Sequence, residues 1–117
     1  MNRPAGFSAL VMLTATTFAM SVSSVALADV DADAAQALAK KNGCLKCHAV
    51  DKTKKGPSYK KIAEKFKGKP DGMEKCIKNI TTGPKVKLED GTEEDHKIIE
   101  TKDDKEQKNL CEWILSR

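Results

Sequence analysis

Long apolar segments, internal repeats and aromatic residues are scarce in this sequence of 117 residues. The apolar run from Phe7 to Met20 is interrupted by threonines and is shorter than the roughly 20 residues that a membrane-spanning helix needs, so a membrane-embedded protein is not expected. No internal repeat or low-complexity segment is present, and nothing indicates a repeat architecture. Aromatic residues make up only 4% of the chain, which leaves little bulky apolar surface for a core.

Histidines and clustered catalytic side chains are also few. His48 and His96 are the two histidines, and no acid–base or nucleophile arrangement is recognisable elsewhere, so an enzyme is not expected. Beyond residue 28 the net charge is only about +3, which does not indicate nucleic-acid binding. The charges are nevertheless sorted along the chain, because 40–69 holds eleven lysines and two acids whereas 89–106 holds nine acids and three lysines.

Residues 1–28 have the pattern of a secretory signal peptide. Arg3 precedes the apolar run, and Ala26-Leu27-Ala28 is a small-residue cleavage site. Cleavage there would leave residues 29–117, which are enough for a single small domain. The pattern predicts a soluble protein exported to the periplasm, where thiols do not normally remain free.

Apolar periodicity in 29–117 predicts four short helices: 33–41, 59–66, 73–80, and one that begins near Thr101 and includes Trp113. Asp71 is the predicted N-cap of the third helix. The apolar faces consist of Ala34, Ala37 and Leu38; Tyr59, Ile62, Ala63 and Phe66; Met73, Cys76, Ile77 and Ile80; and Leu110, Trp113 and Ile114. Between the third and last helices, 85–99 alternates apolar and charged residues around Asp90-Gly91, which predicts a short β-hairpin or an ordered loop. The fold class is therefore all-α.

The motif Cys44-Leu45-Lys46-Cys47-His48 is the strongest chemical signal. A C-x-x-C pair can be a thioredoxin-like redox couple, half of a zinc site or a haem attachment site. A redox couple should follow a strand in an α/β pattern, and a four-cysteine zinc site should have a second close pair, whereas Cys76 and Cys111 are 35 residues apart.

Haem attachment agrees with the whole motif. Two cysteine sulfurs one helical turn apart can form thioethers with the vinyl groups of protoporphyrin, and the next residue, His48, then binds the iron. A C-x-x-C-H motif in an exported chain therefore predicts one covalently bound haem c, attached at Cys44 and Cys47. The porphyrin would also supply apolar surface that the few aromatic residues do not.

The order of these elements resembles class I monohaem cytochrome c of the bacterial periplasm, over nearly all of 33–116. The pieces that match are CLKCH, Gly56-Pro57-Ser58-Tyr59 with its helix, and the final Trp113-Ile114-Leu115. The resemblance implies a cytochrome c fold of four short helices around the haem. It also implies that the Pro57 carbonyl orients His48 and that Trp113 is structural. Tyr59 resembles the tyrosine that meets a haem propionate, and a purely core role is the alternative.

The chain departs from this family at the sixth iron ligand. The family usually fills this position with a methionine. Met73 does not match that methionine, because it lies only 25 residues beyond His48 and on the apolar face of a predicted helix. His96 lies 48 residues beyond His48, close to where the family's methionine would fall. We therefore predict His48 and His96 as axial ligands, with Met73, a lysine such as Lys85 or Lys87, and an open site as alternatives.

Cys76 and Cys111 remain after haem attachment. In an oxidising compartment such a pair most simply forms one disulfide, which would join the third helix to the last; two buried free thiols are the alternative.

With both axial positions filled, the iron has no open position for a substrate, which predicts a one-electron shuttle. Lys46, Lys52, Lys54, Lys55 and Lys60 flank the haem attachment motif and would steer the protein, as a monomer, toward redox partner proteins with acidic docking surfaces. The alternative function is a haem-based gas-binding or sensor protein with an open or displaceable sixth ligand.

Overall fold

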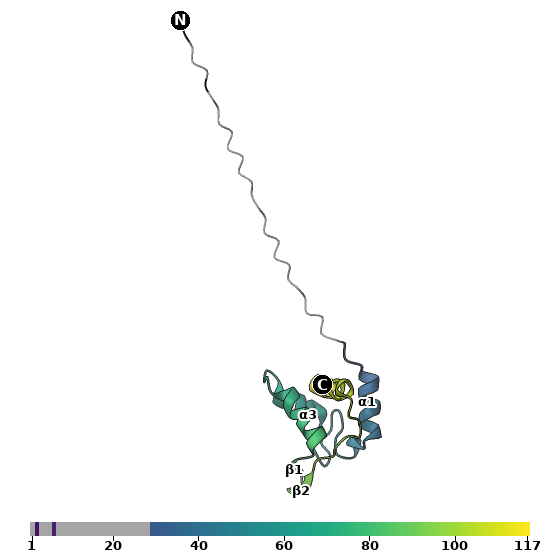
Figure 1. The fold of residues 1–117 in the computed structure, drawn as a ribbon. Coiled ribbons are helices and arrows are strands. Elements are labelled where there is room, and N and C mark those ends of the chain that lie inside the picture. Colours follow the sequence, from purple (N-terminus) through teal and green to yellow (C-terminus); the bar gives the residue numbers. More distant parts are fainter. Residues whose placement is uncertain (1, 3–5, 7–28) are drawn as a thin grey trace.

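The computed structural model describes residues 2, 6 and 29–117 (Figure 1). Within these residues the elements are α1 (Ala32–Lys41), the short 3-10 helix η1 (Cys44–Lys46), α2 (Tyr59–Phe66), α3 (Gly72–Thr82), β1 (Lys85–Lys87), β2 (Glu93–Asp95) and α4 (Asp104–Leu115). The fold is mainly helical, as predicted. Apart from Asn2 and Gly6, the predicted export segment 1–28 lies outside the described residues. None of the helices described is long and apolar enough to cross a membrane.

Short polar side chains define where the helices begin. Each of three helices starts after a residue whose side-chain oxygen accepts a backbone N–H of the first turn, which satisfies a donor that has no partner inside the helix. These N-caps are Asp31 for α1, Ser58 for α2 and Asp103 for α4. Asp71 occupies the same position before α3, but its carboxylate pairs with Lys75 Nζ at 2.8 Å and forms no cap hydrogen bond.

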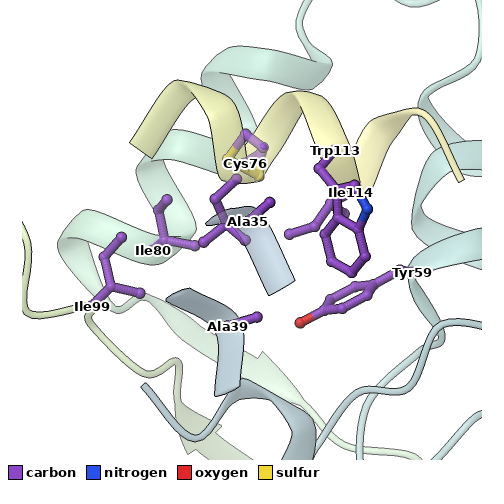
Figure 2. Close-up of a cluster of buried hydrophobic side chains, with 10 residues drawn as sticks. Ala35, Ala39, Tyr59, Cys76, Ile80, Ile99, Trp113 and Ile114 are labelled. Carbon is purple, nitrogen blue, oxygen red and sulfur yellow. A yellow bond between two sulfur atoms is a disulfide. The ribbon is translucent and has the colours of Figure 1, made fainter. Parts of the chain in front are cut away.

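Helix α4 is the centre of the domain, because α1, α2 and α3 all pack against it. Its inward residues Leu110, Cys111, Trp113 and Ile114 are all buried. Figure 2 shows Trp113 and Ile114 of α4 beside Tyr59 of α2 in the buried cluster. The terminal-helix face predicted from the sequence is the one that the structure buries.

Helix α1 uses a different face from the one predicted. Its fully buried residues are Ala35 and Ala39, whereas Ala34 and Ala37 are exposed and Leu38 is half-buried. The sequence of α1 is alanine-rich on several sides, so the periodicity alone does not select a face. Small residues at the contact allow α1 to approach α4 closely, and the packing partner decides which alanines are buried.

A disulfide joins α3 to α4. Cys76 and Cys111 are bonded through their Sγ atoms, and their Cα atoms are 5.9 Å apart, a separation within the range of native disulfides. Cys111 has no exposed surface, so the bond lies inside the core.

Strands β1 and β2 form an antiparallel hairpin after α3. Lys85 pairs with Asp95, Val86 with Glu94 and Lys87 with Glu93. The hairpin ends just before His96, and the chain then returns to the core, where Ile99 is only 2% exposed and its backbone N–H donates to the Ile80 carbonyl at 2.9 Å. The predicted hairpin is present, and it is shorter than the predicted range 85–99.

Candidate haem site

The haem attachment motif forms a single tight turn directly after α1. Gly43 precedes it with φ +70°, a left-handed conformation that a residue with a side chain rarely adopts. The Cys44 carbonyl then accepts the backbone N–H groups of Cys47 at 3.2 Å and His48 at 3.0 Å. The turn therefore gathers two half-buried free thiols and an imidazole at one place. Burial raises the pKa of the Cys44 thiol, which keeps it protonated at neutral pH.

The backbone after the motif fixes the orientation of His48. His48 Nδ1 lies 2.6 Å from the Pro57 carbonyl oxygen. A carbonyl can only accept, so Nδ1 carries the proton and the lone pair of a neutral ring is on Nε2, which is left free to bind a metal. Burial lowers the pKa of His48 and favours this neutral form, although the bond to Pro57 acts in the opposite direction.

Gly56 allows the loop to approach this ring. A Cβ at Gly56 would lie 3.0 Å from His48 Cε1 and 3.4 Å from the Cys47 carbonyl oxygen, closer than ordinary van der Waals contact. The Gly56 N–H donates to the same carbonyl at 2.9 Å. A side chain at this position would press on the imidazole, so the glycine helps the loop to bring Pro57 close to His48.

Tyr59 and Trp113 form the inner wall beside His48. The rings of His48 and Tyr59 are stacked with centroids 5.3 Å apart, and Trp113 meets Tyr59 edge-on at 5.4 Å. Tyr59 Oη and Trp113 Nε1 are buried and have no hydrogen-bond partner among the described residues. Burial raises the pKa of the Tyr59 hydroxyl far above its ordinary range, so the group remains a donor.

The structure brings the second histidine to the first. The ring centroids of His48 and His96 are 6.2 Å apart, although 48 residues separate the two positions in the sequence. His96 follows β2 directly, and its backbone N–H donates to the Pro84 carbonyl at 2.9 Å. Its Nδ1 lies 3.0 Å from the Lys97 carbonyl oxygen, so here too the Nε2 lone pair is free.

The alternative iron ligands considered from the sequence have other surroundings. Met73 is half-buried in the first turn of α3, where it packs against the core and borders a surface groove of about 700 Å³ with Phe66 and Leu115. Lys85 Nζ lies 3.3 Å from Asp95 Oδ1 on the exposed side of the hairpin. Lys87 is exposed opposite Glu93.

The five lysines predicted to flank the attachment motif are all exposed: Lys46, Lys52, Lys54, Lys55 and Lys60. Lys54 Nζ donates to the Leu45 carbonyl at 2.5 Å, so its charge is held against the attachment turn itself. Leu45, between the two cysteines, is one of the few large apolar side chains on the surface, at 38% exposed.

Two contacts of the site were missed in the sequence. Gly83 ends α3 with φ +59°, and a Cβ there would lie 2.7 Å from the His96 carbonyl oxygen. Asn42 ends α1, and its side chain accepts the Glu100 N–H from 58 residues away. A glycine directly after a helix can be recognised in the sequence as a left-handed helix end. The contact of Asn42 with Glu100 depends on tertiary structure.

The residues present fit a covalently attached haem. The two thiols on one turn supply the attachment points, and His48 offers Nε2 to the iron. The buried hydroxyl of Tyr59 and the indole N–H of Trp113 are donors without a protein acceptor, and buried donors of this kind usually have a partner. Carboxylate groups on a porphyrin would provide suitable acceptors.

Comparison with known proteins agrees with this geometry. Residues 32–117 match the family model described as "Cytochrome c". The chain is 35% identical over 65 residues to cytochrome c-551 of Allochromatium vinosum, covering 56% of this chain and 63% of that protein. It is 32% identical over 79 residues to cytochrome c-552 of Hydrogenobacter thermophilus, covering 68% of this chain and 76% of that protein.

Solved structures show the same relationship. The class 1 cytochrome MtoD from Sideroxydans lithotrophicus ES-1 superimposes with a TM-score of 0.72 at 55% identity, over 75% of this chain and 97% of MtoD. Wild-type cytochrome c552 of Nitrosomonas europaea gives 0.55 at 31% identity, over 69% of this chain and 96% of that protein. The chain therefore belongs to the cytochrome c family, as a class I monohaem cytochrome c: a haem-based electron-transfer protein with one covalently attached haem c.

Proposed function

We propose that this cytochrome is a periplasmic one-electron shuttle whose iron is held by His48 on one side and His96 on the other, in a low-spin state. When bound, the haem supplies the one-electron ferric–ferrous couple. The chain's part is to occupy both axial positions, exclude substrates from the iron and present the attachment edge to partners. The observation that carries this proposal is the approach of the two imidazoles.

The separation of the rings fits one metal ion between them. An imidazole nitrogen binds a transition metal at about 2.0 Å, so two rings that coordinate one ion from opposite sides have centroids about 6 Å apart. The centroids of His48 and His96 are 6.2 Å apart. Both rings direct Nδ1 to a backbone carbonyl, which fixes the tautomer that leaves Nε2 for iron.

The other candidate ligands are engaged elsewhere. Lys85 Nζ lies 3.3 Å from Asp95 Oδ1 on the exposed side of the hairpin. Met73 lies among apolar side chains of α3, where a thioether is an ordinary core residue. These surroundings favour His96 over either residue as the sixth ligand.

Replacing His96 tests the proposal directly. The ferric wild-type protein should lack the far-red methionine-to-iron charge-transfer band, His96→Met should gain it, and the reduction potential of His96→Met should be higher because a thioether favours ferrous iron. Met73→Leu is the matched control and should change neither spectrum nor potential. A charge-transfer band in the wild type that disappears in Met73→Leu would disprove ligation by His96.

The charge distribution supports an acidic partner. Lys46, Lys52 and Lys60 are exposed around the attachment turn, through which electrons would leave the haem edge. Such a surface attracts an acidic partner over about 10 Å at 0.1 M salt and loses this effect as salt rises. Electron exchange with a purified acidic redox protein should slow with added salt, and Lys46→Ala should slow it more than Lys105→Ala on α4. A rate that does not depend on salt would contradict the docking proposal.

Export and subunit state complete the proposal. We expect cleavage after Ala28, so that the periplasmic fraction contains a monomer beginning at Asp29 with the mass of residues 29–117 plus one haem. Intact-mass measurement of that fraction without reduction checks the cleavage, the haem and the disulfide together. A mass equal to the amino acids alone would contradict the thioether assignment.

One observation favours the alternative of a gas-binding or sensor protein. His96 is only half-buried and follows a hairpin whose strands are exposed, so its displacement would be easier than that of His48. Carbon monoxide distinguishes the two functions. Slow or absent binding to the ferrous protein fits a locked carrier, whereas binding as fast as in His96→Ala would favour a sensor.

A further inference from the structure

Asn42 is a buried polar residue between the two halves of the site. It caps the end of α1, immediately before Gly43 and the haem attachment turn, and it is 5% exposed. Its side-chain Nδ2 donates to the Leu38 carbonyl at 2.9 Å, and its Oδ1 accepts the backbone N–H of Glu100 at 2.9 Å. The carboxamide is therefore oriented unambiguously, since one neighbour only accepts and the other only donates.

Glu100 belongs to the segment that carries the second imidazole. It lies four residues after His96, and the backbone between them is tied down at three points. The His96 N–H donates to Pro84, the Ile99 N–H donates to Ile80, and the Glu100 N–H donates to Asn42. The first bond joins the segment to Pro84, two residues beyond α3, the second joins it to α3 itself, and the third joins it to the end of α1.

We propose that Asn42 is a positioning residue for His96, which holds the ligand segment against the end of α1 and so sets how firmly His96 stays on the iron. The inference rests on the ligation by His96 proposed above. Without the Asn42 acceptor, the Glu100 N–H needs a water molecule as its hydrogen-bond partner. It reaches water best when the segment from His96 to Glu100 moves away from α1. Movement of Glu100 away from α1 increases the freedom of His96 and favours the detached imidazole.

The chain offers a matched control at the other end of the same helix. Asn109 of α4 uses the same two side-chain atoms at a more exposed position: its Oδ1 accepts the Asp31 N–H at 2.9 Å and its Nδ2 donates to the Asp31 carbonyl at 2.8 Å, both at the N-cap of α1. Both side chains join α1 to a distant part of the chain. Only Asn42 joins it to the segment that carries His96.

The test is displacement of His96 by added imidazole in the ferric holoprotein, together with carbon monoxide binding to the ferrous form. Asn42→Leu should bind either ligand about tenfold more tightly than the wild type, the size expected for one buried hydrogen bond. Asn109→Leu should lose global stability in denaturant but bind both ligands as the wild type does. Equal ligand affinities in Asn42→Leu and Asn109→Leu would overturn the proposal.

Two further measurements keep the outcome decisive. Hydrogen exchange at the Glu100 amide should be faster in Asn42→Leu than in the wild type and unchanged in Asn109→Leu. If Asn42→Leu does not fold, Asn42→Ser and Asn109→Ser provide the same comparison. A Glu100 amide that exchanges at the wild-type rate in Asn42→Leu would contradict the role assigned to the Oδ1 acceptor.

His96→Ala separates failure of this inference from failure of the ligation itself. If the wild type binds imidazole as tightly as His96→Ala, His96 is not a ligand and the positioning role falls with it. If the wild type binds more weakly than His96→Ala but no differently from Asn42→Leu, ligation by His96 stands and the role of Asn42 alone is refuted.

Discussion

Loss of the bond between Cys76 and Cys111 should weaken the fold severely without removing the haem. The bond closes a loop of 35 residues, and the loop-closure entropy of that length corresponds to about 4 kcal/mol. A domain of 89 residues has a total free energy of unfolding of about 4 to 13 kcal/mol, so the bond accounts for a large share of it. The midpoint of thermal unfolding should fall by about 15 to 30 °C.

The assay is denaturant unfolding followed by far-UV circular dichroism, on the ferric wild type and on a ferric Cys76→Ala, Cys111→Ala double variant, both without reductant, which would also reduce the haem iron. The double variant should unfold at lower denaturant. Its absorption spectrum should still show attached haem, because Cys44 and Cys47 are separate from this bond. A difference below about 1 kcal/mol between the wild type and the double variant would refute the loop-entropy argument.

Three smaller predictions concern local geometry and pH. Gly83→Ala should lower the free energy of unfolding by about 1 to 3 kcal/mol and loosen His96, because it places a Cβ 2.7 Å from the His96 carbonyl oxygen at a left-handed φ. Gly91→Ala is the control, since Gly91 has φ +86° but no neighbour within 4 Å. It should lower the free energy of unfolding less and leave the ligand spectrum unchanged. Ser58→Ala should cost about 1 kcal/mol in denaturant unfolding through loss of the α2 cap, and no change would contradict that role. In the haem-free chain, where no iron occupies Nε2, burial lowers the pKa of His48, so the stability of that form should hold above the ordinary histidine value of about 6.5 and fall below it, because the unfolded chain takes up a proton there that the folded ring does not; unfolding midpoints of the haem-free chain that do not change between pH 7.5 and 5 would contradict this.

Local signals were sufficient where the sequence leaves one choice. The attachment motif is recognisable within five consecutive residues and Tyr59 to Phe66 has a single apolar face, whereas the Ser58 cap of α2 was not predicted. The alanine-rich α1 has no such single face, and the prediction chose Ala34 and Ala37 instead of Ala35 and Ala39. Alanine periodicity carries little information about direction, because burying either set of methyl groups contributes a similar free energy.

Contacts between distant segments were the harder part of the site. His96 could be proposed as a neighbour of His48 because few residue types bind iron and the chain has only two histidines. The hydrogen bond between Asn42 and Glu100 could not be proposed from the sequence, since asparagine after a helix is common and its partner lies 58 residues away. Tertiary packing, not local propensity, brings these two segments together.

The central position of α4 affects the order in which the domain can assemble. The three earlier helices pack on residues 104–115, which follow them all in the chain, so they have no shared surface until that segment has been made. Contacts between the two ends of a domain close the largest loops and form slowly. Cys44, Cys47 and His48 therefore precede in the chain the helix that completes the core around them, and the two thiols remain accessible until α4 has packed against the other helices.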